Sequence, residues 1–134
     1  MKTVIRSFVL LASLSLSFGC GTRDSEKSTP AKPDDRFEKR FLEVIRISEE
    51  GKKQEALAQI ATDAADAGDT ANTWKALGWM KDPGGRDAVA RSCALKLAAL
   101  GKVDDATLIA SHQINNADLK DKTLAEVVKS MSDK

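Results

Sequence analysis

The chain has 134 residues, with 21 Lys and Arg against 20 Asp and Glu, a single His and two Cys. This length fits one domain of ordinary size. The near-neutral charge lacks the basic footprint of a nucleic-acid-binding protein, and one His with two Cys cannot supply a recognisable zinc site. We therefore expect no nucleic-acid partner, no metal and no cofactor.

The chain begins with basic residues and an apolar run. Lys2 and Arg6 precede an apolar stretch that ends at Phe18, and Cys20 follows two places on. This order is typical of a secretory signal, and the stretch is shorter than the roughly 20 residues that a membrane-spanning helix needs. We expect residues 1–19 to be a signal peptide.

The segment Leu16-Ser17-Phe18-Gly19-Cys20 resembles the lipobox of bacterial lipoproteins. The resemblance implies that the Cys20 sulfur carries diacylglycerol, that cleavage makes Cys20 the first residue, and that its amino group is then acylated. Gly21 resembles the sorting pattern of outer-membrane lipoproteins that face the periplasm. The alternative is an ordinary secreted protein, because Ser17 and Gly19 also suit the common signal peptidase.

Residues 20–35 are polar and contain Pro30 and Pro33, with no apolar period. Such a composition is typical of a disordered tether. We therefore expect three parts in the chain: a signal peptide over 1–19, a lipidated Cys20 with its tether over 20–35, and a folded domain over 36–131.

Everything after Asp35 predicts helix and turn, because apolar residues recur at three-to-four spacing and no run alternates as a strand would. We expect an all-α domain of about six helices. They span about 36–50, 53–67, 70–81, 86–100, 103–114 and 119–131, with breaks at Gly51, Gly68, Gly84-Gly85, Gly101 and Asn116. The expected inward residues include Phe37, Phe41, Val44, Ile45, Leu57, Ile60, Ala61, Ala64, Trp74, Leu77, Met80, Leu124, Val127, Val128 and Met131.

The breaks recur about every 16 or 17 residues, so two helices make a unit of about 33. A helical hairpin of this period resembles the tetratricopeptide repeat. Gly51 with Ala56, and Gly101 with Ala106, look like that family's turn glycine and the small residue five places on. The resemblance implies three antiparallel hairpins in an open array; a closed six-helix bundle is the alternative.

No residue pattern predicts catalysis. His112 is the only histidine, and its neighbour Ser111 should point about 100° away on a helix, so we expect no nucleophile–base pair. Asp63 and Asp66 suit a solvated face, and Asp104 with Asp105 suit a helix start. We expect a non-enzymatic protein.

Cys93 stands in an apolar stripe and predicts a buried free thiol, because acylation of Cys20 would leave it without a partner. Trp74 and Trp79 are five residues apart and cannot share one stripe of a helix. We expect Trp74 in the core beside Leu77, and Trp79 on a rim where an indole would bind a partner.

Together these features predict a membrane-anchored envelope lipoprotein that binds a protein or peptide through the surface of a helical array. A structural lipoprotein without a dedicated groove is one alternative. A protein that binds a small apolar ligand between its helices is another.

Overall fold

The computed structural model describes residues 35–133, so the predicted signal peptide, Cys20 and the predicted tether up to residue 34 lie outside the described residues. The described part is all-α, with six helices and no strand, as predicted. The helices are α3 (Asp35–Ile45), α4 (Glu50–Asp66), α5 (Thr70–Trp79), α6 (Pro83–Ala99), α7 (Val103–Gln113) and α8 (Ala117–Ser132).

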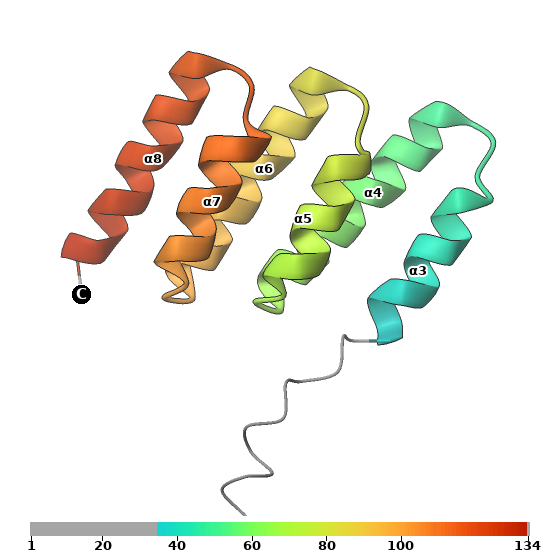
Figure 1. Cartoon of the computed structure of the whole chain (residues 1–134), viewed down its shortest axis with the longest axis horizontal. Helices are drawn as coiled ribbons and strands as arrows, with labels where there is room; N and C mark the ends of the chain where they lie inside the picture. Colours follow the sequence, from blue (N-terminus) through green and yellow to red (C-terminus); the bar gives the residue numbers. More distant parts are fainter. Residues whose placement is uncertain (1–34, 134) are drawn as a thin grey trace, which may run out of the picture. The chain divides into compact units, whose positions relative to one another are not determined.

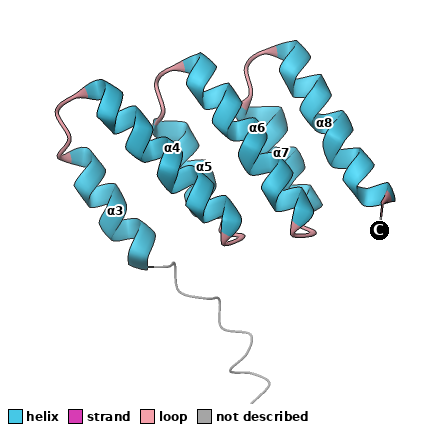
Figure 2. Cartoon of the chain, turned by 180° about the vertical axis from the view of Figure 1, so that it is seen from behind, coloured by secondary structure: helices cyan, strands magenta, loops and turns pink. Residues whose placement is uncertain are grey.

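The helices form two layers. α4, α6 and α8 lie side by side in one layer, and α3, α5 and α7 make the other (Figure 1). Along the chain, α4 pairs most closely with α5, and α6 with α7. α3 and α8 lie at opposite ends of the row in both views (Figure 1, Figure 2). The helical unit is therefore an open array and not a closed bundle.

The array repeats at the predicted period. α4, α6 and α8 begin at Glu50, Pro83 and Ala117, each about 33 residues after the last. We call this spacing one repeat. α4–α5 and α6–α7 are complete hairpins. Among the described residues, α3 is the second helix of a hairpin without its first, and α8 is a first helix without its second.

Two glycines make the tight turns inside the complete hairpins. Gly68 (φ 71°) follows α4 and Gly101 (φ 83°) follows α6, and the left-handed backbone that both adopt favours glycine. After each turn glycine the next amide bonds back into the helix, Asp69 N to Ala64 O at 2.8 Å and Lys102 N to Leu97 O at 2.9 Å. These bonds satisfy helix-end carbonyls, so the second turn is the same structure as the first, placed one repeat later.

Gly51 and the pair Gly84-Gly85 are not breaks, contrary to the prediction. Gly51 is the second residue of α4, and Gly84 and Gly85 lie in the first turn of α6. Asp82 caps α6 by accepting a hydrogen bond from Gly85 N at 2.7 Å, and Pro83 takes the first helical position, where its missing N–H costs nothing. The repeat is therefore phased by Gly68 and Gly101, with Thr73 and Ala106 as the buried small residues five places on.

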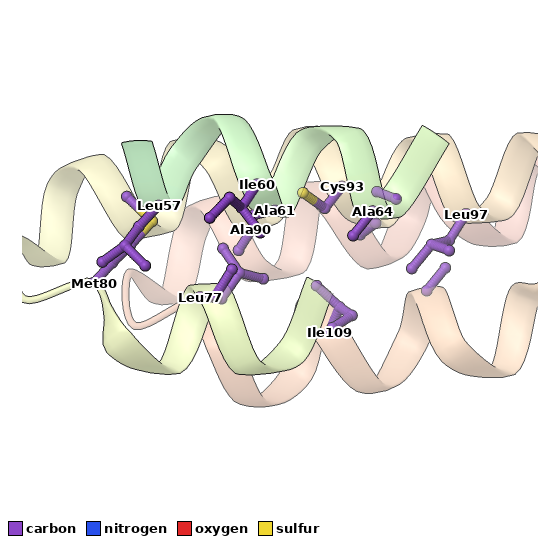
Figure 3. Close-up of a cluster of buried hydrophobic side chains, with 14 of the residues drawn as sticks. Leu57, Ile60, Ala61, Ala64, Leu77, Met80, Ala90, Cys93, Leu97 and Ile109 are labelled. Carbon is purple, nitrogen blue, oxygen red and sulfur yellow. The ribbon is translucent and has the colours of Figure 1, made fainter. Parts of the chain in front are cut away.

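The core is built largely from small side chains. Ile60 and Ala61 of α4 lie beside Leu77 of α5, and Ala90 and Leu97 of α6 belong to the same buried cluster (Figure 3). Small residues let helix axes approach closely, so a narrow array can exclude water. The fully buried members include Leu57, Ile60, Ala61, Ala64, Ala76, Leu77, Ala90, Cys93, Ala94, Leu97, Ala106, Ile109, Ala110 and Val127.

Four predicted core residues are exposed instead: Trp74 of α5, described below, and three on the terminal helices. Ile45 of α3 is exposed, and Val128 and Met131 of α8 have 61% and 56% of their surface accessible. These three belong to helices at the ends of the array. An apolar stripe is buried only where another element covers it, and the terminal helices have a neighbour on one side only.

Candidate interaction surface

The two tryptophans are almost equally exposed. Trp74 has 39% of its surface accessible and Trp79 has 40%. The prediction that Trp74 lies in the core was wrong, because Thr73, Ala76 and Leu77 form the buried side of α5 and place the position of Trp74 at its edge. Trp79 lies on a rim, at the last residue of α5.

Each indole contacts a ring on a different neighbouring helix. Trp79 meets Phe41 of α3 with 5.2 Å between ring centroids and an interplanar angle of 65°, and Trp74 meets His112 of α7 at 5.8 Å. Phe41 precedes Trp74 by one repeat, as Trp79 precedes His112. The two contacts are thus one contact repeated along the array, and we call these four rings the ring ladder.

A lysine lies over the first rung of the ring ladder. Lys75 Nζ is 4.4 Å from the centroid of Phe41 and 5.5 Å from that of Trp79. An ammonium at this distance is attracted to the negative face of an aromatic ring. Lys75 therefore holds a positive charge beside the partly exposed Trp79 and over the buried ring of Phe41.

More exposed apolar side chains lie on the helices that carry the ring ladder. Leu42 and Ile45 of α3 and Leu108 of α7 are about half exposed. A hollow of about 240 Å³ adjoins the Trp79 end. Its lining consists of Val44, Ile45, Lys53, Leu57, Trp79 and Lys81. An exposed apolar and aromatic surface with a shallow hollow is typical of a site that binds another protein or a peptide.

Ser111 and His112 lie closer together than predicted. Ser111 Oγ is 3.1 Å from His112 Nδ1. The Ser111 hydroxyl, however, donates to Thr107 O at 2.6 Å, and His112 Nδ1 also lies 3.2 Å from Leu108 O. A base that activates a nucleophile must accept the hydroxyl proton, and here a backbone carbonyl accepts it. Ser111 and His112 therefore make side-chain contacts to backbone carbonyls on the surface of α7.

The other singled-out residues connect helices. Asp63 pairs with Arg40 of α3 at 2.7 Å, and the Arg40 hydrogen bond holds the pKa of Asp63 below its usual value. Asp66 pairs with Lys96 of α6, and Asp105 accepts a hydrogen bond from Thr70 of α5 at 2.8 Å. The prediction of a merely solvated face for Asp63 and Asp66 was therefore incomplete, because both carboxylates bridge to a neighbouring helix.

Cys93 is a buried free thiol, as predicted. Burial raises its pKa to about 12. A thiol that resists ionisation is a poor nucleophile, so Cys93 serves as a small apolar residue of the core.

Residues 35–133 contain no cluster of three or more His, Cys, Asp or Glu side chains placed to hold a metal ion. None of the helices α3 to α8 is long and apolar enough to cross a membrane. Comparisons with protein-family models, curated proteins and solved structures gave no match to this chain.

Proposed function

We propose that this protein is a membrane-anchored lipoprotein of the bacterial envelope whose helical array binds a protein or peptide partner without catalysing a reaction. The anchor rests on the lipobox resemblance at Cys20. The binding role rests on the ring ladder, where two indoles of α5 remain partly exposed although tryptophan side chains are on average highly buried.

The chemistry of the surface favours an apolar segment that carries a carboxylate. The rings of Trp74 and Trp79 supply contact area at low entropic cost, and Lys75 supplies a positive charge beside Trp79. Leu42, Ile45 and Leu108 extend the apolar area to the neighbouring helices. A partner with aromatic or aliphatic side chains beside an acidic residue would match this pattern.

The experiment is cross-linking in intact cells with the full chain, followed by affinity measurement on the captured partner. Trp79→Ala should weaken binding about thirtyfold, equivalent to about 2 kcal/mol, if Trp79 is a hot spot. Leu100→Ala is the matched control, because Leu100 is exposed at the α6–α7 turn, away from the ring ladder. Equal capture by wild type, Trp79→Ala and Trp74→Ala would contradict the proposed surface.

A further inference from the structure

The two ends of the array carry complementary halves of a hairpin. α3 exposes the side on which a first helix would pack, and α8 exposes the side on which a second helix would pack. We propose that copies of this chain associate head to tail, with α8 of one copy seated between α3 and α4 of the next, so that the array continues from molecule to molecule.

A groove at the α3 end corresponds to the surfaces on which the internal first helices pack: α4 packs on α5 and α6, and α6 packs on α7 and α8. We call each such surface a seat. The groove has a volume of about 400 Å³ and is lined by Lys39, Arg40, Glu43, Val44, Ile47, Ala56, Gln59 and Ile60. One repeat after Arg40, Val44 and Ile60 stand Thr73, Leu77 and Cys93, which are buried where α4 packs on α5 and α6. The groove is therefore the first seat of the array, and no described helix fills it.

The exposed face of α8 carries core residues. Val128 and Met131 stand one repeat after Ala94 and Leu97 of α6, and those in turn stand one repeat after Ala61 and Ala64 of α4. All four positions in α4 and α6 are fully buried, whereas Val128 and Met131 are mostly exposed. A helix that closed the array would need a polar outer face, whereas α8 exposes two large apolar side chains there, Val128 and Met131.

A repeated polar clasp gives an independent reason for a second copy. The fifth residue of α4, Gln54, accepts a hydrogen bond from Lys81 N in the loop before α6 at 2.9 Å. The fifth residue of α6, Asp87, accepts from Asn115 N at 2.8 Å and Asn116 N at 2.9 Å in the loop before α8. Each first helix thus fastens the loop that begins the next hairpin.

The fifth residue of α8 is Asp121, an exposed carboxylate without a hydrogen bond or ion pair among the described residues. In a head-to-tail pair, Asp121 of one copy would fasten a loop of the next copy, the one that corresponds to the loop containing Lys81. That loop lies between α3 and α4, and its residue one repeat before Lys81 is Ser48. The Ser48 amide donates no hydrogen bond within residues 35–133. Acceptor and donor therefore occur at opposite ends of the same array, which is the arrangement a head-to-tail contact requires.

Arg40 and Glu43 give this seat a charged rim that the internal ones lack, because the equivalent residues of α5 are Thr73 and Ala76. A charged rim packs less closely than the small buried residues of the internal seats, so the contact between copies is weaker than the packing inside the array and reversible. A head-to-tail contact joins two different surfaces, so every open assembly keeps a free surface at each end and can add further copies.

Complementary variants of the full chain test the proposal. Val128→Glu with Met131→Glu disables the α8 surface, and Ala56→Glu disables the groove; the first two residues are exposed and Ala56 is half-buried at the groove wall. Sedimentation velocity of wild type, in detergent where needed, should show mass rising with concentration. Each variant alone should stay monomeric, and the two mixed should form a one-to-one pair that grows no further.

Asp121→Ala should weaken association at least about tenfold, and Asp118→Ala, another exposed acidic residue of α8, should leave it unchanged. Leu108→Glu lies on the ring-ladder side and should leave it unchanged as well, which separates this contact from the partner surface proposed above. A wild type that stays monomeric at every concentration would overturn the proposal. Association that survives both end variants, or variants that fail to pair when mixed, would do the same.

Discussion

Trp74 and Trp79 stand five residues apart on α5 and contact opposite neighbours, His112 of α7 and Phe41 of α3. One short helix is therefore joined to two others through its two largest side chains. Both rings remain partly available to a partner, because neither contact buries its indole.

Trp74→Ala and Trp79→Ala should lower the free energy of unfolding by similar amounts, about 1–2 kcal/mol each, because each partly exposed ring loses one aromatic contact and part of its buried area. A buried Phe or Trp truncated to Ala costs about 3–5 kcal/mol instead. Urea unfolding measures the difference. Leu77→Ala, which removes a fully buried side chain, is the control and should cost more than either. If Trp74→Ala alone cost about as much as Leu77→Ala, the result would contradict the exposed position of Trp74.

Gly68→Ala and Gly101→Ala should each lower the free energy of unfolding by about 1 kcal/mol or more, because alanine is strained at positive φ. Gly51→Ala is the matched control. A Cβ at Gly51 would meet nothing within 4 Å, and Gly51 is helical, so alanine there should be neutral or stabilise by about 0.5–1 kcal/mol. Thermal or urea melts that rank the three variants differently would refute the turn assignment.

Asp87→Ala should destabilise the array by about 1–3 kcal/mol, because it leaves the amides of Asn115 and Asn116 without their carboxylate acceptor. Gln54→Ala should cost less, since Gln54 accepts from a single amide, that of Lys81, at an exposed site. Hydrogen exchange at Asn115 and Asn116 should quicken in Asp87→Ala and stay unchanged in Gln54→Ala. Slow exchange in both variants would show that the clasp contributes little.

Alkaline pH should destabilise the folded protein through Cys93. The pKa of its thiol is raised from 9.0 to about 12, so the folded state resists losing this proton. The stabilising effect is complete below pH 9 and is lost as the pH rises from 9 toward 12, to a limit of about 4 kcal/mol. Cys93→Ala removes this part of the pH dependence. The chain has no Tyr, so in a Cys20→Ser background thiolate absorbance reports the ionisation of Cys93 directly; ionisation near pH 9 without unfolding would contradict the burial of the thiol.

Cys20 should be the lipidated first residue of the mature protein. Each buried CH₂ of an acyl chain contributes about 0.8 kcal/mol, and two or more chains anchor stably where one does not. Intact mass spectrometry should show cleavage before Cys20 with added acyl mass, and Cys20→Ser should leave the membrane fraction or stay unprocessed. An unmodified amino terminus in the wild type would refute the lipoprotein hypothesis.

The number of helices and their period followed from the spacing of apolar residues and breaks, since periodicity is a local signal that neighbouring helices reinforce. The phase of the hairpins did not follow. In the sequence, Gly51 and Gly68 look like the same kind of helix break. Only the structure distinguishes them: Gly68 has a left-handed backbone and is followed by the α5 cap Asp69, so it makes a turn, whereas Gly51 lies at a helix start. A glycine near a boundary fits either side of it.

The ring ladder was half predicted. The spacing of Trp74 and Trp79 indicated that one indole would leave the core, but whether the other stayed depended on Thr73 and Ala76 taking the buried side of α5. That choice is made by packing against α4 and α6, which no local pattern encodes. The sequence did hold one signal for the ring ladder: Phe41 stands one repeat before Trp74, and His112 stands one repeat after Trp79. This relation can be recognised only once the boundaries of the repeat are known.

Because α3 lies at one end of the array and contributes Phe41 to the ring ladder, its stability should depend on whether a partner is bound to the ring ladder. α3 packs mainly on α4, and the Phe41–Trp79 contact with Lys75 above it is a side-chain link to α5. In an array stabilised by nearest neighbours, such a terminal helix opens at a lower free energy than the central ones. A ligand that covers Trp79 together with the exposed Ile45 of α3 would oppose that opening, so amide protection in α3 would report binding without any label on the partner.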